Sequence, residues 1–263
     1  MSEQQGILHG RTAVITGGGR GIGAEVARSL AAAGAAVLVS ARTESEIEAL
    51  ADELTQAGHR AYAATADVAD EESVAALARA AAEHLGGVDI LVNNAGIAAS
   101  APLARITLED WNRIFAVNVT GTFLCTQAFL PAMVETGWGR IINVASVAGR
   151  SGGQYMAHYS SSKHAQVGFT RCAAAEVAGR GVTVNALCPG YVDTEMTRQS
   201  IERIVAKTRL DEEQALKNLQ QTSGHGRLVT PQEVADAALW LCGDGAASVN
   251  GQAIVIDGGG FLG

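Results

Sequence analysis

The chain has 263 residues, of which 48% are hydrophobic and 17% charged, and its net charge is −8. This length suits one α/β domain of ~250 residues. The composition excludes wholesale disorder, and the acidic balance argues against nucleic-acid binding, which usually shows as a basic excess. We therefore expect a single domain over residues 1–263 with no nucleic-acid partner.

The sequence also favours a cytoplasmic protein that has no membrane partner. Segment 1–10 lacks a basic region followed by an apolar run, so no signal peptide is predicted. Apolar stretches such as 24–39 are interrupted by charges, here Glu25 and Arg28, and no membrane span is expected. The four cysteines are far apart and form no CxxC pair, so no metal site is expected.

Apolar, β-rich runs alternate with helical periodicity along the whole chain. Strands are predicted at 12–16, 36–40, 61–65, 89–92, 139–145, 182–187 and 252–256, and helices at 21–33, 44–57, 71–85, 108–133, 158–178 and 231–242. Near-continuous Val, Ile and Ala in the strands is typical of strands covered on both faces. The alternation predicts an α/β fold with a doubly wound parallel sheet of about seven strands. Residues 194–227 break the rhythm with polar helical sequence, which we interpret as a lid insertion.

A glycine-rich segment joins the first strand to the first helix, with five glycines between Thr16 and Gly23. Without Cβ atoms, such a backbone can turn tightly and approach a pyrophosphate at the positive end of the helix. The spacing is GxxxGxG (Gly17, Gly21, Gly23) and not GxGxxG, and no P-loop lysine follows. A tight βα turn without a ligand remains the alternative, but the place after the first strand favours a dinucleotide loop.

The end of the second strand bears on the choice between NADP and NAD. NAD-binding folds usually place an acidic residue there for the ribose 2′-hydroxyl, whereas this chain has Arg42. Arg20 lies in the glycine loop, and two guanidinium groups would suit a 2′-phosphate, which predicts NADP(H). Glu44 and Glu46 follow closely, so an Arg42 that merely pairs with them, with NAD(H) as the cofactor, stays open.

Tyr159 and Lys163 lie four residues apart on a predicted helix and therefore share one face. An ammonium ~4 Å from a phenol, at an effective dielectric of ~20, would favour phenolate by roughly 4 kcal/mol before screening and desolvation. The phenol pKa would then fall from ~10 toward working pH. An exposed Tyr–Lys pair is the alternative. Ser146 follows strand 139–145 at the carboxyl edge of the sheet, where it could hydrogen-bond a substrate carbonyl oxygen.

Together with Asn93-Asn94-Ala95-Gly96, Asn118 and Pro189-Gly190, these motifs have the order and spacing of the short-chain dehydrogenase/reductase family. The chain resembles this family over essentially its whole length, in particular 3-oxoacyl and polyketide ketoreductases and 3-hydroxybutyrate dehydrogenases. The resemblance implies a Rossmann-type fold and direct hydride transfer between C4 of a nicotinamide and a carbonyl carbon.

The resemblance also implies a role for each site residue. Tyr159 would exchange the proton, Lys163 would lower its pKa and hold the nicotinamide ribose, and Ser146 would orient the substrate oxygen. Asn118 would kink its helix and hold a water in the proton relay. The expected cofactor-binding residues are Gly17, Gly19, Arg20, Gly21, Ile22, Gly23, Arg42, Asp67, Val68, Asn94, Ala95, Gly96, Tyr159, Lys163, Pro189, Gly190, Val192 and Thr194, with Asp67 and Val68 at the adenine ring.

Five residues are expected to bind substrate: Ser146, Gln154, Tyr159, Tyr191 and Met196. Gln154 could hydrogen-bond a carboxyl or thioester oxygen. His158, next to the tyrosine, is expected to be a packed or surface residue and not a catalyst. The lid resembles those of relatives that act on 3-oxoacyl thioesters, and its basic residues could contact CoA or an acidic carrier protein. Acidic residues are mixed among them, which favours a solvated lid.

The sequence therefore predicts an NADP(H)-dependent carbonyl reductase, acting on a 3-oxoacyl-type or related ketone. An NAD-dependent dehydrogenase for 3-hydroxybutyrate or a cyclic alcohol remains an alternative, as does a nucleotide-binding regulator without turnover. The family resemblance implies a homotetramer. Helices 108–133 and 159–178 carry more small and apolar surface than one sheet face can cover.

Overall fold

The computed structural model describes residues 6–261, so part of segment 1–10, with its predicted lack of a signal peptide, lies outside the described residues. Seven parallel strands form one sheet in the order β3-β2-β1-β4-β5-β6-β7, which confirms the predicted doubly wound architecture. They are β1 (Thr12–Thr16), β2 (Ala36–Ala41), β3 (Ala61–Thr65), β4 (Ile90–Asn93), β5 (Gly139–Val144), β6 (Val182–Pro189) and β7 (Ala253–Ile256). The order reverses between β1 and β4, which is where such sheets bind ligands.

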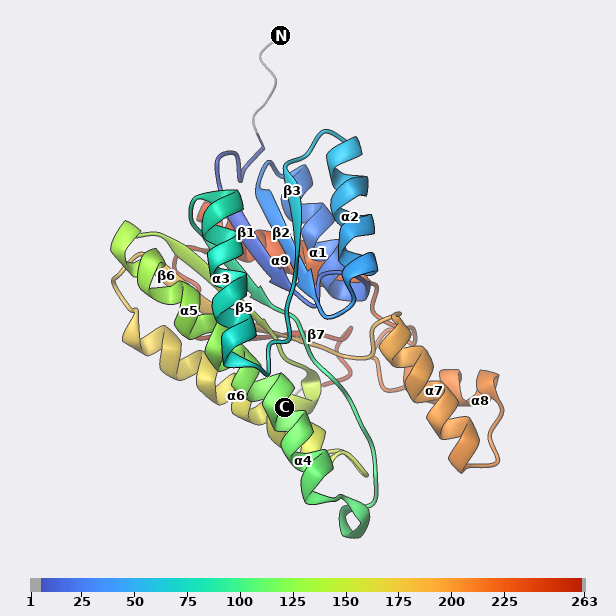
Figure 1. Ribbon diagram of the computed structural model, residues 1–263. Coiled ribbons are helices and arrows are strands. Elements are labelled where there is room, and N and C mark those ends of the chain that lie inside the picture. Colours follow the sequence, from blue (N-terminus) through green and yellow to red (C-terminus); the bar gives the residue numbers. More distant parts are fainter. Residues whose placement is uncertain (1–5, 262–263) are drawn as a thin grey trace.

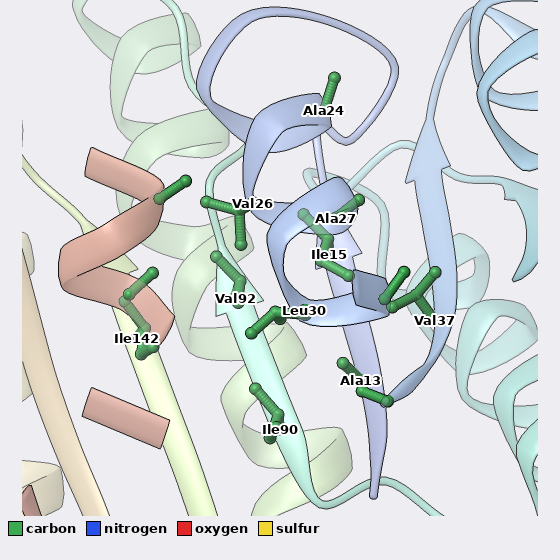
Figure 2. Close-up of a cluster of buried hydrophobic side chains, with 14 of the residues drawn as sticks. Ala13, Ile15, Ala24, Val26, Ala27, Leu30, Val37, Ile90, Val92 and Ile142 are labelled. Atoms are coloured by element: carbon green, nitrogen blue, oxygen red, sulfur yellow. The ribbon is translucent and has the colours of Figure 1, made fainter. Parts of the chain in front are cut away.

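Helices cover both faces of the sheet (Figure 1). One face carries α1 (Gly21–Ala32), α2 (Glu44–Gln56) and α9 (Pro231–Cys242), and the other carries α3 (Glu71–Leu85), α5 (Gly121–Thr136) and α6 (Ala157–Glu176). Figure 2 shows the first core, where Val26 and Leu30 of α1 face Ile90 and Val92 of β4. Adjacent strand residues point to opposite faces, so Leu91 belongs to the second core.

Several helix ends follow directly from the sequence. The side chain of Asp70 accepts a hydrogen bond from Ser73 N at 2.7 Å and begins α3, which ends at Gly86 with a left-handed φ of 77°. A capping box between Thr230 and Glu233 begins α9. These local signals explain why the helices begin and end close to their predicted limits.

The predicted helix 108–133 is not regular. It consists of α4 (Leu108–Phe115) and α5, joined by a π-turn over Ala116–Thr120. The stretch Leu108–Thr136 is long and apolar enough to cross a membrane, and the expectation of no such segment overlooked its charge-free part, 114–134. In this fold α5 covers the sheet, where Cys125, Phe129 and Met133 pack in the second core.

The lid contains two helices, α7 (Glu195–Lys207) and α8 (Glu212–Gln220), which lie beside the main body (Figure 1). They have a small core of their own, built on Ile201 and Leu219. A parallel bridge between Val192 and Val229 joins the two ends of the insertion, where Val229 N donates to Tyr191 O at 2.9 Å. The insertion therefore leaves the body and returns to it at almost one point.

Candidate active site

A cavity of about 610 Å³ lies between the carboxyl ends of the strands and the lid. Many of the residues predicted from the sequence line it: Ile22, Asn94, Gly96, Ser146, Gln154, Tyr159, Lys163, Pro189, Gly190, Tyr191, Val192, Thr194 and Met196. The rest of the glycine loop, Arg42, Asp67, Val68, Ala95 and Asn118 do not line it. The structure thus brings together the residues expected around the nicotinamide and the substrate.

The glycine loop leaves the start of α1 open to an anion. Gly17 and Gly21 have left-handed φ values of 62° and 56°, which glycine adopts without strain. A Cβ at Gly23 would overlap the carbonyl of Gly17 and the side chain of Asn94. Extended Arg20 is the N-cap residue, and no side chain caps the helix. Its first N–H groups can therefore donate to a phosphate, so the loop fits a dinucleotide.

Asn94 holds this loop in place. Its Nδ2 donates to Thr16 O at 3.0 Å and to Gly17 O at 2.9 Å. The neighbouring Asn93 is buried and donates to Asn143 Oδ1 at 2.9 Å, which ties β4 to β5. The side-chain amide of Asn93 thus joins the ends of β4 and β5, and that of Asn94 holds the glycine loop.

The two arginines expected at a 2′-phosphate differ in their surroundings. Arg20 Nη1 lies 3.4 Å from Glu46 Oε1, and its side chain is 64% exposed. Arg42 directly follows β2, is exposed and makes no ion pair with any residue in the range 6–261. The acidic neighbour thus pairs with Arg20 and leaves Arg42 free, the reverse of the pairing considered from the sequence.

The remaining cofactor candidates lie on both sides of the loop. Asp67 is half-buried, and Val68 is buried against Gly121. A Cβ placed at Gly21 would lie 3.2 Å from Thr194 Cγ2, so the lid begins directly against the glycine loop. Gly190 N donates to Ile256 O at 3.0 Å and extends the pairing of β6 with β7 beyond the strand.

The contact between Tyr159 and Lys163 differs from the expected one. The Lys163 Nζ lies 5.9 Å from the centre of the tyrosine ring. Burial raises the pKa of Tyr159 to about 12, although its hydrogen bond with Ser146 opposes the rise. Burial also lowers the pKa of Lys163 to about 8. Burial is thus the largest influence on the pKa of both groups, and the raised phenol pKa differs from the fall expected from a nearby ammonium.

The Lys163 ammonium has two partners that the sequence analysis missed in this role. It donates to Val144 O at 2.8 Å and to Gln166 Oε1 at 2.9 Å. Fully buried Gln166 in turn donates to Thr122 Oγ1 at 2.9 Å. Gln166 follows Lys163 by three residues on a helix, and this spacing is the one signal that could have revealed it.

Asn118 lies in the π-turn and is fully buried. Its Oδ1 accepts from Ile97 N at 2.9 Å, and its Nδ2 donates to Ile97 O and to Ser162 Oγ, both at 3.0 Å. Its backbone carbonyl accepts from Thr122 Oγ1 at 2.9 Å. The Asn118 side chain thus fixes the loop that follows β4, and the Asn118 backbone carbonyl already accepts a hydrogen bond from Thr122.

Ser146 and His158 occupy contrasting positions. Ser146 lines the cavity; its Oγ accepts from Ala148 N at 3.1 Å, and its hydroxyl donates to Pro189 O at 3.5 Å. His158 is 1% exposed, does not line the cavity, and has its pKa lowered by burial. The expectation that His158 is a packed residue is confirmed.

Two further residues form the cavity wall: Tyr155, a candidate lining residue from the sequence, and Arg203, one of the basic lid residues that could contact CoA or an acidic carrier. Tyr155 has a left-handed φ of 64°, and its carbonyl accepts from Ala101 N at 2.9 Å. Arg203 of α7 lines the cavity from the lid. The sequence did not single out Arg203 among the basic lid residues, since that depends on how the lid folds back over the sheet edge. Within the described range, no group of three His, Cys, Asp or Glu side chains could hold a metal.

The fold and this site are those of a dinucleotide-dependent dehydrogenase. Residues 11–204 match the family model described as short chain dehydrogenase, and the chain belongs to this family. It is therefore an oxidoreductase that acts on ketones or secondary alcohols.

Characterised proteins share this architecture over nearly their full length. The 3-oxoacyl-(acyl-carrier-protein) reductase FabG of Aquifex aeolicus (strain VF5) is 37% identical and covers 97% of this chain and 98% of its own. The D-beta-hydroxybutyrate dehydrogenase of Cupriavidus necator is 38% identical, with 96% and 98% covered. A crystal structure of an actinorhodin polyketide ketoreductase with NADPH has a TM-score of 0.92 and 39% identity, and the match covers 98% of each chain.

Proposed function

We propose that this protein reduces a 3-oxoacyl-type or related ketone with NADPH. The observation that carries the proposal is the convergence of Ser146, Tyr159 and Lys163 on one cavity at the carboxyl edge of the sheet. The similarity to FabG and to a polyketide ketoreductase supports the substrate class. The similarity to D-beta-hydroxybutyrate dehydrogenases supports an alternative function, the oxidation of a hydroxy acid.

The residues have complementary roles in this proposal. NADPH supplies the hydride when it is bound. The Ser146 hydroxyl orients and polarises the substrate oxygen, and Tyr159 donates its proton to that oxygen as negative charge develops on it. A pKa of about 12 keeps the phenol protonated before reaction. Lys163, held by Val144 O and Gln166, would bind the nicotinamide ribose hydroxyls and stabilise the tyrosinate.

The free guanidinium of Arg42 and the open start of α1 support NADP(H) over NAD(H). The glycines of the loop and Asn94 would hold the pyrophosphate side, and Pro189, Gly190, Val192 and Thr194 would hold the nicotinamide side. Gln154, Tyr191 and Met196 would contact the substrate, which could be a CoA or carrier-protein thioester.

We further propose one domain that forms a homotetramer in the cytoplasm. Phe123 of α5 is 42% exposed and makes an edge-on contact with Phe169 of α6 at 6.4 Å between ring centres. The apolar outer surface of these two helices would be covered by a second copy. This is also the stretch that by length and composition could cross a membrane.

The test is the Tyr159→Phe variant, which keeps the ring and removes the proton. We expect kcat for ketone reduction to fall by about 10²–10⁴ while NADPH binding, measured by fluorescence, persists. Undiminished reduction by the variant would refute the mechanism. A wild-type protein that binds NADPH and reduces no acyl thioester, diketone or cyclic ketone would favour a regulatory role instead.

A further inference from the structure

Arg203 gives the cavity a positive charge at the lid. Among the lining residues that the structure describes, the other charged side chains are Lys163 and Asp257. Lys163 already has its own partners, and the Asp257 carboxylate accepts from Gly259 N at 2.9 Å and Phe261 N at 2.6 Å. Of these three charged groups, Arg203 is the one with a buried N–H that has no hydrogen-bond partner.

The guanidinium of Arg203 has only neutral partners. Its Nη1 donates to Ala98 O at 3.3 Å and its Nη2 to Ser200 Oγ at 2.9 Å. Its Nε atom is buried without a hydrogen-bond partner. No carboxylate of residues 6–261 lies within 4.0 Å of it. Since a guanidinium has five N–H donors, several of its donors remain available.

Two other arginines in and beside the lid, Arg198 and Arg227, form ion pairs. Arg198 pairs with Asp193 at 3.7 Å and Glu195 at 3.5 Å, and Arg227 pairs with Glu233 at 2.7 Å. Arg198 belongs to the same helix as Arg203 but does not line the cavity. Arg209 is exposed and also makes no ion pair with the described residues, but it does not line the cavity. Arg203 is therefore the lid arginine of residues 6–261 that both lacks an ion pair and faces the cavity, where an incoming group could supply negative charge.

A partly buried charge with an unpaired donor is costly unless an opposite charge and further hydrogen bonds compensate it. Carboxylates and phosphates do so in the fork-to-fork geometry that suits a guanidinium. We propose that Arg203 binds an oxyanion of the substrate. This proposal rests on the proposed ketone reduction and identifies the substrates as anionic.

The oxyanion must lie apart from the reacting carbonyl. Ser146 and Tyr159 belong to β5's end and α6, on the main body, whereas Arg203 belongs to α7 of the lid. A substrate between them would present its carbonyl to the body and its negative group to the lid. The carboxylate of a free 3-oxo acid and the phosphates of a thioester carrier arm share this chemistry, so the experiment must distinguish them.

The experiment compares three ketones that share the acetoacetyl group and differ in the charge attached to it. Acetoacetate carries a carboxylate, acetoacetyl-CoA carries phosphates, and ethyl acetoacetate is neutral. Arg203→Met removes the charge, and Arg203→Gln removes the charge but keeps a neutral hydrogen-bond donor. Arg198→Met is the matched control on the same helix. We expect both Arg203 variants to lower kcat/KM at least tenfold, through KM, for an anionic substrate and less than twofold for the neutral ester.

The pattern across substrates identifies the ligand. A loss confined to acetoacetate points to a carboxylate, a loss confined to acetoacetyl-CoA points to a phosphate, and a loss on both shows that either is accepted. Equal losses on all three ketones would make Arg203 a structural tie between lid and loop and would overturn the proposal. So would wild-type behaviour of Arg203→Gln.

Calorimetry with the protein saturated with NADP⁺ separates this proposal from the proposed function. If the wild type reduces none of the ketones, the proposed function fails, and binding of acetoacetate and acetoacetyl-CoA still tests Arg203. Binding that is weakened at least tenfold in Arg203→Met and kept in Arg198→Met supports the oxyanion site. No binding of either anion to the wild type, or equal binding to all variants, overturns it.

Discussion

The Lys163 ammonium donates to the side-chain carbonyl of Gln166 at 2.9 Å, and its nitrogen remains 5.9 Å from the centre of the Tyr159 ring. Gln166 donates onward to Thr122, whose hydroxyl donates to the carbonyl of Asn118. A buried chain of side chains thus connects the lysine to the π-turn. Because these hydrogen bonds lie in the buried interior, Gln166 holds the Lys163 ammonium in position and favours its protonated form over the neutral amine.

Replacing Gln166 should change the pKa of Lys163. Gln166→Leu removes an acceptor of the ammonium, and hydrogen bonds to charged groups are worth about 1.5–3 kcal/mol, or about one to two pKa units. The pKa should fall further, because burial still opposes the charge. We expect the alkaline limb of the kcat/KM profile to move about one unit toward lower pH.

Gln166→Glu should act in the opposite direction, since a carboxylate favours the ammonium and raises the pKa of Lys163. The alkaline limb should then move to higher pH, while the NADPH dissociation constant measured near pH 7 serves as a check on folding. Identical pH profiles in all three proteins would show that Gln166 is only a packing residue.

Lys163 should also make stability depend on pH. Burial lowers its pKa from 10.5 to about 8, so between these values the unfolded chain holds a proton that the folded chain has lost. The free energy of unfolding therefore rises with pH in this window, by up to about 3 kcal/mol at about 1.4 kcal/mol per pKa unit. Lys163→Met lacks this contribution. Urea unfolding at pH 7.5 and 10 should show the wild type gaining stability relative to the variant, and a constant difference would contradict the assignment.

Arg42 should determine cofactor preference. We expect Arg42→Ala to raise the KM for NADPH by about tenfold or more with little change for NADH, because one charge-assisted hydrogen bond to the 2′-phosphate is lost. Arg20→Ala should have a smaller effect, since Glu46 already offsets that exposed charge. Steady-state kinetics with both cofactors measures this. A wild type that prefers NADH would refute the assignment before any variant is made.

The proposed tetramer can be tested at Phe123. Phe123→Arg places a charge on the outer surface of α5, and we expect sedimentation velocity at micromolar concentration to show smaller species than the wild type. Trp240→Arg is the matched control, because Trp240 is 50% exposed on α9, which covers the other face of the sheet. A monomeric wild type, or an unchanged Phe123→Arg assembly, would exclude this interface.

The fold was largely predictable because its signals are local. Runs such as Ala13-Val-Ile are apolar without interruption since both sheet faces are covered, and Asp70 and Gly86 mark the ends of α3 by their own conformational preferences. The π-turn was not predictable in form, because no simple spacing rule distinguishes it from a regular helix. The charge-free part of Leu108–Thr136 shows that hydropathy alone does not separate a sheet-covering helix from a membrane span.

The site was predictable as a set of positions, but not in its electrostatics. Motif spacing predicted that Ser146, Tyr159 and Lys163 lie together, and in the structure all three line one cavity. The pKa values of the tyrosine and the lysine depend on burial and on partners such as Gln166, which only the packed structure supplies. The free charge of Arg203 likewise depends on which acidic residues its neighbours have already bound.

The parallel bridge between Val192 and Val229 has a consequence for how this enzyme could diversify. The insertion leaves and re-enters the body at one short seam, and its 36 intervening residues (193–228) also form hydrogen bonds with the body at Ala98 and Asp257. The proton-transfer groups belong to the body, whereas Met196 and Arg203 belong to the insertion. The groups that transfer the proton and part of the wall that contacts the substrate therefore lie on separate segments of the chain. Exchanging residues 195–228 for those of a relative should change substrate preference more than it changes the reaction.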